Sequence, residues 1–240
     1  MQPSFILIHG AWHGGWAWDP VAERLRSGGF GVVAPTLLGL GERAAEVTPR
    51  TCLSDHVGQV VGEIDAVAGP LVLVGHSYGG MVIAGAASRR PERVVRLVYL
   101  DALVPADGES VATFAGPDFV GAGRADADAR GDGCVGTGFF PPTKFVDWEG
   151  ERLERFAARL TPQPLQAFLE PVRLEGDISR IPADFVLATD EPLGLFEPFA
   201  EEARGRLGWR VFELPTRHDA MLTMPGVVAA MLAEPWISGG

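Results

Sequence analysis

This sequence contains little cysteine and lysine, and it carries no net positive charge. Its 240 residues include two cysteines, Cys52 and Cys134, which are too few for a disulfide framework. Lys144 is its one lysine, and 31 acidic residues against 20 basic ones give a formal net charge of −11. Because no basic stripe offsets phosphate repulsion, this charge argues against nucleic acid or an anionic membrane surface as a partner.

We expect neither a targeting segment nor a membrane-spanning segment. The first residues lead directly into a short apolar run, with no positively charged segment and no long apolar segment of a signal peptide. No stretch approaches the roughly 20 apolar residues that a membrane span needs. We therefore expect a cytoplasmic protein, monomeric or homodimeric, with no membrane partner.

What is present is an alternation of apolar runs and helical patterns, with 47% hydrophobic residues and glycine and proline spread throughout. Strands are predicted at 5–8, 30–34, 71–74, 94–100, 185–188 and 210–214. Helices are predicted at 20–26, 81–87, 196–206 and 227–232. A further helix is predicted to begin after Ser54, which would be its N-cap. Strands separated by helices of this length indicate an α/β fold, a mostly parallel doubly wound sheet with helices on both faces.

The middle of the chain breaks this alternation. From 105 to 182 the pattern predicts no buried strand, and 148–160 and 164–169 resemble amphipathic helices. We interpret 105–182 as a helical cap insertion over the active site, which leaves 1–104 and 183–240 as the core. For 115–138, which is rich in Gly, Ala and Asp, the alternative is a poorly ordered surface excursion.

The motif GHSYGG at 75–80 follows the predicted strand 71–74 and precedes the small-residue helix. A strand that breaks at Gly-x-Ser-x-Gly and continues as a helix forms a nucleophile elbow, in which a tight turn exposes the serine hydroxyl above the sheet. We expect Ser77 to be the nucleophile. The competing interpretation is a glycine-rich turn with a bystander serine.

A serine nucleophile needs a base, which is nearly always histidine. We predict His218, because it follows the last strand on the edge where the strands open. His56 lies on a helix face and is interpreted as a surface or packing residue. His9 and His13 are four residues apart, but on a strand end and in a glycine loop, so we expect no metal site.

The oxyanion hole is predicted from two backbone N–H groups. Tyr78 follows the nucleophile and supplies the first, and Ala11 in the loop HGAWHGGW at 9–16 supplies the second. Gly10 would let this loop approach the substrate, and Trp12 would line an apolar pocket or simply pack. We take Gly10, Trp12 and His76, the variable position of the elbow, as candidate substrate contacts.

Together, the loop 9–16, the elbow 75–80 and the late His218 resemble the α/β-hydrolase superfamily, and most the branch of plant methyl esterases, hydroxynitrile lyases and small bacterial esterases. The likeness covers roughly 5–104 and 183–232 and is weak across the insertion. It implies the α/β-hydrolase fold with a catalytic Ser-Asp-His triad and no cofactor.

The acid of the triad is where the chain departs from that branch. The resemblance implies an Asp on the loop after the penultimate strand, at a position that Pro192 occupies here. Asp190 and Glu191 lie beside it. The other candidate is Asp101, 24 residues after Ser77 at the end of the next strand, which resembles the acid position of pancreatic-type lipases. All three keep the chain order Ser, Asp or Glu, His.

The predicted function is a serine hydrolase of a small hydrophobic or aromatic ester, lactone or thioester. One alternative is a lyase or an intramolecular acyl-transfer or cyclisation enzyme on the same fold. Cyanohydrin cleavage is disfavoured, because the resembling lyases carry Lys and Thr where this chain has Asp219 and Ala11. The other alternative is a non-catalytic small-molecule binding protein. Neither a metal nor an organic cofactor is required.

Overall fold

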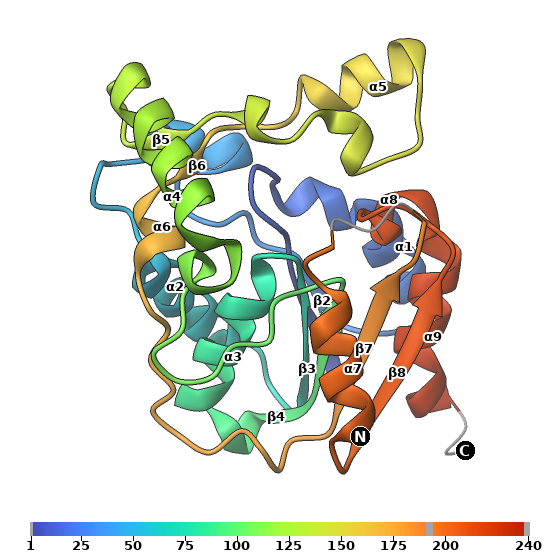
Figure 1. The fold of residues 1–240 in the computed structure, drawn as a ribbon. Helices are drawn as coiled ribbons and strands as arrows, with labels where there is room; N and C mark the ends of the chain where they lie inside the picture. Colours follow the sequence, from blue (N-terminus) through green and yellow to red (C-terminus); the bar gives the residue numbers. More distant parts are fainter. Residues whose placement is uncertain (1, 191–193, 238–240) are drawn as a thin grey trace.

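The computed structural model describes residues 2–190 and 194–237, and its centre is a sheet of six parallel strands (Figure 1). The strand order is β2-β1-β3-β4-β7-β8. The bounds are β1 (Ser4–Ile8), β2 (Val32–Val33), β3 (Leu71–His76), β4 (Val94–Leu100), β7 (Ala183–Ala188) and β8 (Trp209–Leu214). Because all six are parallel, their carboxyl ends meet at one edge, where loops can converge on a site.

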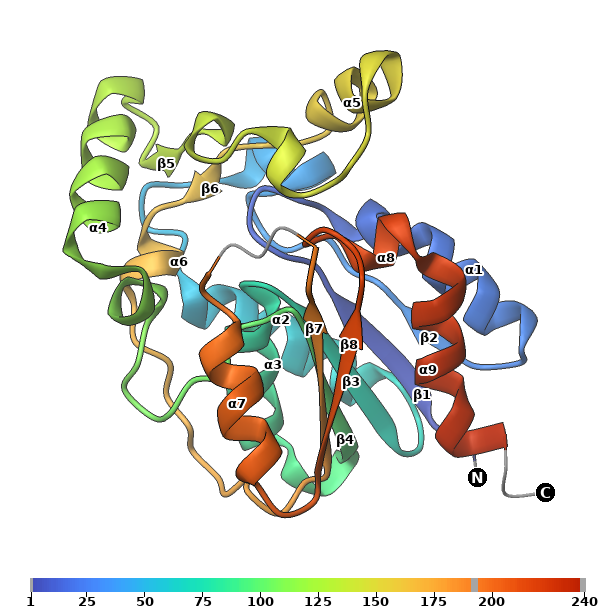
Figure 2. The ribbon, with the colours of Figure 1, turned by 45° about the vertical axis from the view of Figure 1, so that its right-hand side comes forward.

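Helices cover both faces of this sheet, and side chains alternate between the two layers. Phe5 and Leu7 of β1 pack with α1 (Asp19–Ser27), α8 (Ala220–Thr223) and α9 (Pro225–Ile237), whereas Ile6 and Ile8 pack with the other layer. That layer holds α2 (Leu53–Ala66), α3 (Gly79–Arg89) and α7 (Glu197–Gly205) (Figure 2). Short 3₁₀ helices lie at Gly15–Trp18, Gly41–Glu46, Pro91–Arg93, Thr137–Phe139 and Pro142–Lys144.

The segment between β4 and β7 adds no strand to the central sheet, and its middle part lies above the sheet (Figure 1). It contains α4 (Val111–Arg130), β5 (Cys134–Val135), α5 (Gly150–Ala157), β6 (Gln163–Pro164) and α6 (Gln166–Leu169). The expectation of no buried strand here was wrong, since β5 and β6 form a buried antiparallel pair. Two-residue strands are too short to leave an alternating pattern in the sequence.

The region 115–138 is mostly helical and is not a disordered excursion. Most of it belongs to α4, which is kinked at Gly116, where φ is 81°, immediately before Pro117. After the kink, the buried positions of α4 are the small residues Gly123 and Ala127. A helix that packs through small residues has little amphipathic pattern, which explains why its sequence did not predict it.

The start of α2 also differs from the prediction. The helix begins at Leu53, so Cys52 and not Ser54 is its N-cap. Asp55 accepts a hydrogen bond from the Cys52 N–H at 2.9 Å, while Ser54 donates to Glu170 instead.

In the described part of the chain, no helix has both the length and the apolarity to cross a bilayer.

Candidate active site

Ser77 lies at the tight turn between β3 and α3, with φ of 53° in the left-handed region. Its N–H donates to the Leu100 carbonyl at 3.3 Å. The turn needs glycine for lack of space: a Cβ on Gly75 would lie 2.6 Å from the Gly79 carbonyl, and one on Gly79 would lie 2.7 Å from the Ile8 carbonyl. The chain therefore has the elbow geometry that its GHSYGG motif predicts.

His218 and Asp101 form a buried pair at the carboxyl ends of β8 and β4. The His218 Nδ1 lies 2.6 Å from the Asp101 Oδ2, so this nitrogen donates to the carboxylate. The other oxygen, Oδ1, accepts from the Ala188 N–H at 3.1 Å. Burial raises the pKa of Asp101, while the hydrogen bonds from His218 and Ala188 act in the opposite direction. With Nδ1 engaged, His218 keeps Nε2 for other partners.

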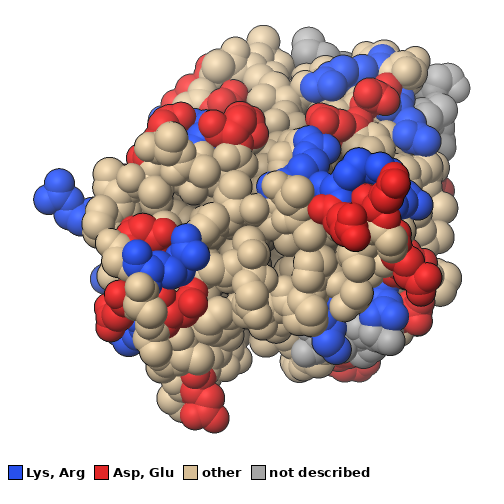
Figure 3. Space-filling model, turned by 90° about the horizontal axis from the view of Figure 1, so that it is seen from above, with Lys and Arg blue, Asp and Glu red and all other residues tan. Residues whose placement is uncertain are grey.

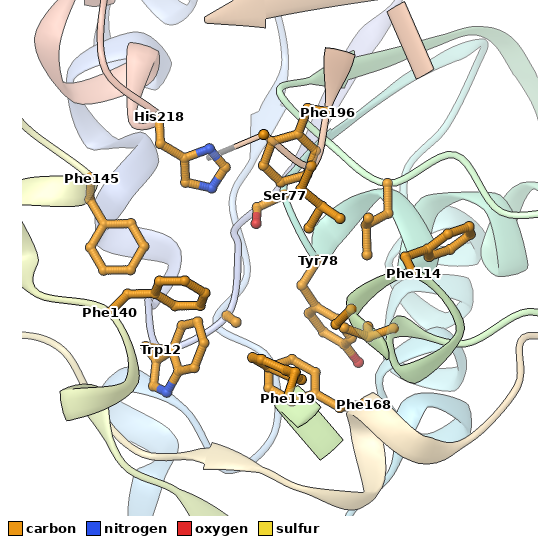
Figure 4. Close-up of a pocket in the computed structure, with 16 residues that line it drawn as sticks. Trp12, Ser77, Tyr78, Phe114, Phe119, Phe140, Phe145, Phe168, Phe196 and His218 are labelled. Atoms are coloured by element: carbon orange, nitrogen blue, oxygen red, sulfur yellow. The ribbon is translucent and has the colours of Figure 1, made fainter. Parts of the chain in front are cut away.

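Ser77 and His218 line the same cavity, and Figure 4 shows the imidazole and the hydroxyl turned toward it. No hydrogen bond joins the two side chains in the described structure. The Phe196 ring stacks on the imidazole with centroids 5.0 Å apart and an interplanar angle of 10°. The imidazole is thus held by Asp101 on its edge and Phe196 on its face.

The predicted acid candidates have different environments. Asp101 is 3% exposed and bonds to His218, whereas Asp190 is exposed and its backbone N–H donates to the Thr216 carbonyl. Glu191 lies outside the described residues. Of the acids whose positions the structure gives, Asp101 is the one that it brings to the imidazole.

Backbone strain is concentrated at this site. Among the described residues, the non-glycine residues with φ in the left-handed region are Trp12 (64°), Ser77 (53°) and Asp101 (44°). Each such conformation costs about 1–3 kcal/mol and persists only where surrounding contacts enforce it. All three lie around the cavity or hold a side chain that does.

Two backbone N–H groups face no protein acceptor. None of the hydrogen bonds in the described part of the chain uses the N–H of Ala11 or of Tyr78. The Trp12 N–H is already engaged, because it donates to the Gln163 Oε1 at 3.3 Å. Ala11 and Tyr78 both line the cavity, so their N–H groups remain available to an anionic oxygen.

His56 is fully buried and contacts Tyr78. Of its two predicted placements, on the surface or in the packing of the protein, the surface was therefore wrong. Its Nε2 bonds to the Leu38 carbonyl at 2.9 Å, so this nitrogen carries the proton and Nδ1 accepts from the Tyr78 hydroxyl at 2.8 Å. Burial lowers the pKa of His56 to about 4 and raises the pKa of Tyr78. The Tyr78 hydroxyl is thus a donor to neutral His56.

The cavity has a volume of about 240 Å³ and an aromatic lining (Figure 4). Its ionisable side chains are His218 and Tyr78 alone among the described residues that line it. The aromatic lining consists of Trp12, Tyr78, Phe114, Phe119, Phe140, Phe145, Phe168 and Phe196. From above, uncharged side chains occupy the middle of this face, with charged side chains of both signs on either side (Figure 3). The cavity therefore suits a neutral apolar ligand.

Of the three candidate substrate contacts, one lines the cavity and two do not. Trp12 lines the cavity, but Gly10 and His76 are not among its lining residues. A Cβ on Gly10 would lie 2.8 Å from the His76 Nδ1 and 3.0 Å from the Ser77 Cβ. Glycine at position 10 thus lets the loop approach the elbow and not the substrate. His76 is buried behind Ser77.

One group of described residues has the composition of a metal site: His76, His218 and Asp219, whose ligand atoms lie within 4.8 Å of one another. Each residue already has a protein partner: the His218 Nδ1 bonds to Asp101, the Asp219 Oδ2 bonds to His13 at 2.9 Å, and the His76 Nε2 lies 3.2 Å from the His218 carbonyl oxygen. The His76 Nδ1 and the Asp219 Oδ1 are buried without a hydrogen-bond partner. We therefore interpret the group as a hydrogen-bonded network. The predicted pair His9 and His13 does not converge on one point, because His9 bonds to Gly10 and Leu37.

Several residues of the site were missed in the sequence. The phenylalanines of the lining come from the segment 105–182 and, for Phe196, from the N-cap of α7, and no motif marks them. Asp219 was noticed only as a departure from lyase sequences, and Gln163 left no signal. The spacing of His9 and His13 marked His13 only as a possible metal ligand, and not as the partner of Asp219.

Comparison with known proteins agrees with this geometry. Residues 5–231 match the alpha/beta hydrolase family. The chain is 35% identical over 240 residues to a carbendazim hydrolyzing esterase of Nocardioides sp., with 96% of this chain and 98% of the relative covered. It is 29% identical over 244 residues to a pyrethroid hydrolase of Sphingobium wenxiniae, covering 96% of this chain and 86% of that protein.

Among solved structures, an extracellular alpha/beta-hydrolase from a Paenibacillus species superimposes with a TM-score of 0.82 at 27% identity, covering 97% of this chain and 98% of that one. That structure is described as sharing structural and functional homology with tobacco salicylic acid-binding protein 2. The family match spans most of the sequence, and the likeness to the esterase spans nearly all of it. The chain belongs to the alpha/beta hydrolase family.

Proposed function

We propose that this protein is a serine hydrolase that cleaves a carboxylic ester, lactone or thioester of a small hydrophobic or aromatic substrate. The observation that carries the proposal is the hydrogen bond of 2.6 Å between the His218 Nδ1 and Asp101, which leaves the Nε2 edge of the imidazole for the cavity that His218 lines together with Ser77. The relatives named as an esterase and a hydrolase support the same reaction class.

In the proposed mechanism, Ser77 Oγ attacks the carbonyl carbon while His218 Nε2 takes the hydroxyl proton. Asp101 keeps the proton on Nδ1 and stabilises the imidazolium that forms. The Ala11 and Tyr78 N–H groups bind the developing oxyanion. His218 then returns the proton to the leaving alcohol or thiol, and a water molecule releases the acyl group by the same route.

The substrate class follows from the lining of the cavity. Aromatic and aliphatic side chains surround Ser77, so a charged group on the substrate would lose hydration without gaining a partner. A cavity of about 240 Å³ fits a small acyl or aryl group. We also propose that 105–182 acts as a cap on a core of 1–104 and 183–240, since this segment supplies much of the aromatic lining.

The test is hydrolysis of p-nitrophenyl acetate by wild type and by Ser77→Ala. We expect Ser77→Ala to lose about 10⁴-fold or more in kcat, because the nucleophile is removed while the oxyanion donors stay. Ser27→Ala is the control, since Ser27 is an exposed serine at the end of α1. Equal rates for wild type and Ser77→Ala would refute the proposal.

A further inference from the structure

A second pair of a histidine and an aspartate lies behind the site, where it touches no substrate. The His13 Nε2 lies 2.9 Å from the Asp219 Oδ2, and both side chains are at most 1% exposed. The His13 Nδ1 lies 2.7 Å from the carbonyl oxygen of Ala11. One ring therefore links the residue after His218 to the carbonyl of Ala11, which lies on the peptide that follows the predicted donor N–H, while the carbonyl on the donor's own peptide, that of Gly10, meets the His9 Nδ1 at 2.8 Å.

The protonation state of His13 follows from its partners. A carbonyl oxygen and a carboxylate oxygen are both acceptors, so each ring nitrogen that meets one must donate. His13 is therefore an imidazolium paired with the Asp219 carboxylate. In agreement, the charge of Asp219 and its hydrogen bond raise the pKa of His13 above 6.5, against the effect of burial.

His76 of the elbow lies close to the same carboxylate. Its Nε2 lies 3.2 Å from the His218 carbonyl oxygen and 3.5 Å from the Asp219 Oδ1, so this nitrogen carries the proton. Burial lowers the pKa of His76 well below 6.5, and the nearby His218 and His13 lower it further. A neutral His76 directly before Ser77 thus joins the elbow to the loop of His218.

The backbone of Asp219 is itself anchored. Its N–H donates to the Phe145 carbonyl at 2.9 Å, and its own carbonyl accepts from the N–H groups of Leu222 and Thr223. The Asp219 carboxylate therefore connects the loop of His218 to the loop of Ala11 through the hydrogen bond with His13. The elbow bonds to the His218 carbonyl through His76, which lies 3.5 Å from the Asp219 Oδ1 without a hydrogen bond to it.

We propose that the buried His13–Asp219 pair is a positioning device for the oxyanion hole, which holds the loop at the Ala11 carbonyl, directly after the donor N–H, and ties it to the loop of His218. This inference rests on the proposed hydrolase function. Oxyanion donors act only if they already point to where the charge develops. A loop that can shift at Ala11 therefore weakens stabilisation of the transition state more than it weakens binding of the ester. Loss of the pair should lower kcat and leave KM nearly unchanged.

The test measures kcat and KM for p-nitrophenyl acetate, with rates normalised to active sites titrated by the p-nitrophenol burst. Asp219→Ala leaves His13 without its partner, and we expect kcat to fall about 10- to 100-fold with KM within about threefold. Asp219→Asn can donate to a neutral His13, which still donates to Ala11. We therefore expect this conservative variant to lose less than about threefold in kcat.

A double-mutant cycle tests whether the two residues act as a unit. His13→Gln combined with Asp219→Ala should lower kcat no further than the worse single variant. Asp184→Ala is the control for a purely structural effect, because Asp184 is a buried carboxylate that pairs with Arg96 and Arg210 away from the cavity. We expect it to lower Tm while kcat per active site stays within about twofold.

Two results would overturn the inference: an Asp219→Ala kcat within twofold of wild type, or an Asp219→Asn loss as large as that of Asp219→Ala. Should Asp219→Ala not fold, ring ¹⁵N NMR of the wild type at pH 7.5 decides, since a singly protonated His13 contradicts the proposed pair. Wild-type turnover that does not depend on Ser77 would instead refute the proposed function, which separates the two failures.

Discussion

Asp101 connects two segments that are far apart in the sequence. One of its carboxylate oxygens accepts from the Ala188 N–H at the end of β7, and the other from the His218 ring. Its φ of 44° lies in the left-handed region, which a residue other than glycine adopts only where surrounding contacts enforce it. A residue in this conformation, with both oxygens engaged, is fixed before any substrate arrives.

The first prediction concerns the choice between acids. Asp101→Asn should lose about 10⁴-fold in kcat, by analogy with the serine-protease triad, because an amide can stabilise the wrong tautomer of His218 and cannot stabilise an imidazolium. Steady-state hydrolysis of p-nitrophenyl acetate measures this loss.

Asp190→Asn is the matched control for Asp101→Asn, since Asp190 is exposed on the neighbouring loop. We expect its kcat to stay within about twofold of the wild-type value, as for most surface substitutions. A nearly silent Asp101→Asn together with a large loss in Asp190→Asn would transfer the role of acid to Asp190.

At the scale of elements, the segment between β4 and β7 is attached to the loop of Ala11 through one residue, Trp12, by its backbone and its side chain. The Trp12 N–H donates to Gln163 of β6, its indole Nε1 donates to the Val135 carbonyl of β5 at 3.1 Å, and its carbonyl accepts from the Thr161 N–H at 2.9 Å. These bonds hold Trp12 at its positive φ. The small β5–β6 sheet therefore supports the oxyanion loop as well as the cavity wall.

The second prediction follows from this attachment. Gln163→Ala removes the acceptor of the buried Trp12 N–H, so the strained backbone at Trp12 should relax and displace the neighbouring Ala11. We expect kcat to fall about tenfold, less than the loss of an entire oxyanion donor. Gln166→Ala is the control, because Gln166 is exposed in the same segment. Equal kcat values for the two variants would show that this link has no catalytic effect.

The elements differ in how far the sequence predicted them. β3, the elbow and α3 were predictable because an apolar run, three glycines and a small-residue helix each leave a local pattern. The kinked α4 and the β5–β6 pair were not, since small residues and two-residue strands give no periodicity.

The site was predictable in the same uneven way. Ser77, His218 and the N–H groups of Ala11 and Tyr78 are tied to motifs and strand ends. The packing of the loops decides which acid meets the imidazole and which groups Asp219 contacts. The spacing of residues in the sequence predicts neither. For that reason the choice among the acids stayed open until their environments were known.

For the whole molecule, the buried histidines make stability depend on pH. Burial lowers the pKa of His9 to about 3, that of His56 to about 4 and that of His76 well below 6.5. Each is neutral in the folded protein at pH 5, whereas unfolded histidine with a pKa near 6.5 is charged. The unfolded state therefore binds more protons below pH 6.5, which favours unfolding.

The third prediction is a fall in the free energy of unfolding as pH decreases from 6.5 to 4, with a slope of up to roughly 4 kcal/mol per pH unit for these three groups. The His13–Asp219 pair has the opposite sign. Its contribution is full below pH 6.5 and is lost as pH rises through the raised pKa of His13.

Urea unfolding across pH 4–8 measures both trends. His56→Gln removes one of the three neutral histidines. It should reduce the slope of the free energy of unfolding against pH below 6.5 by about 1.4 kcal/mol per pH unit, which corresponds to one proton. Stability that stays constant or rises between pH 6.5 and 5 would contradict the assignment of neutral buried imidazoles.

The most direct test of the catalytic account is to trap the covalent intermediate. Wild-type protein mixed with p-nitrophenyl acetate and quenched in acid within the burst phase should carry one acetyl group, which peptide mapping by mass spectrometry places on Ser77. Continued turnover with an unmodified Ser77, or with the acetyl group on another residue, would contradict the account.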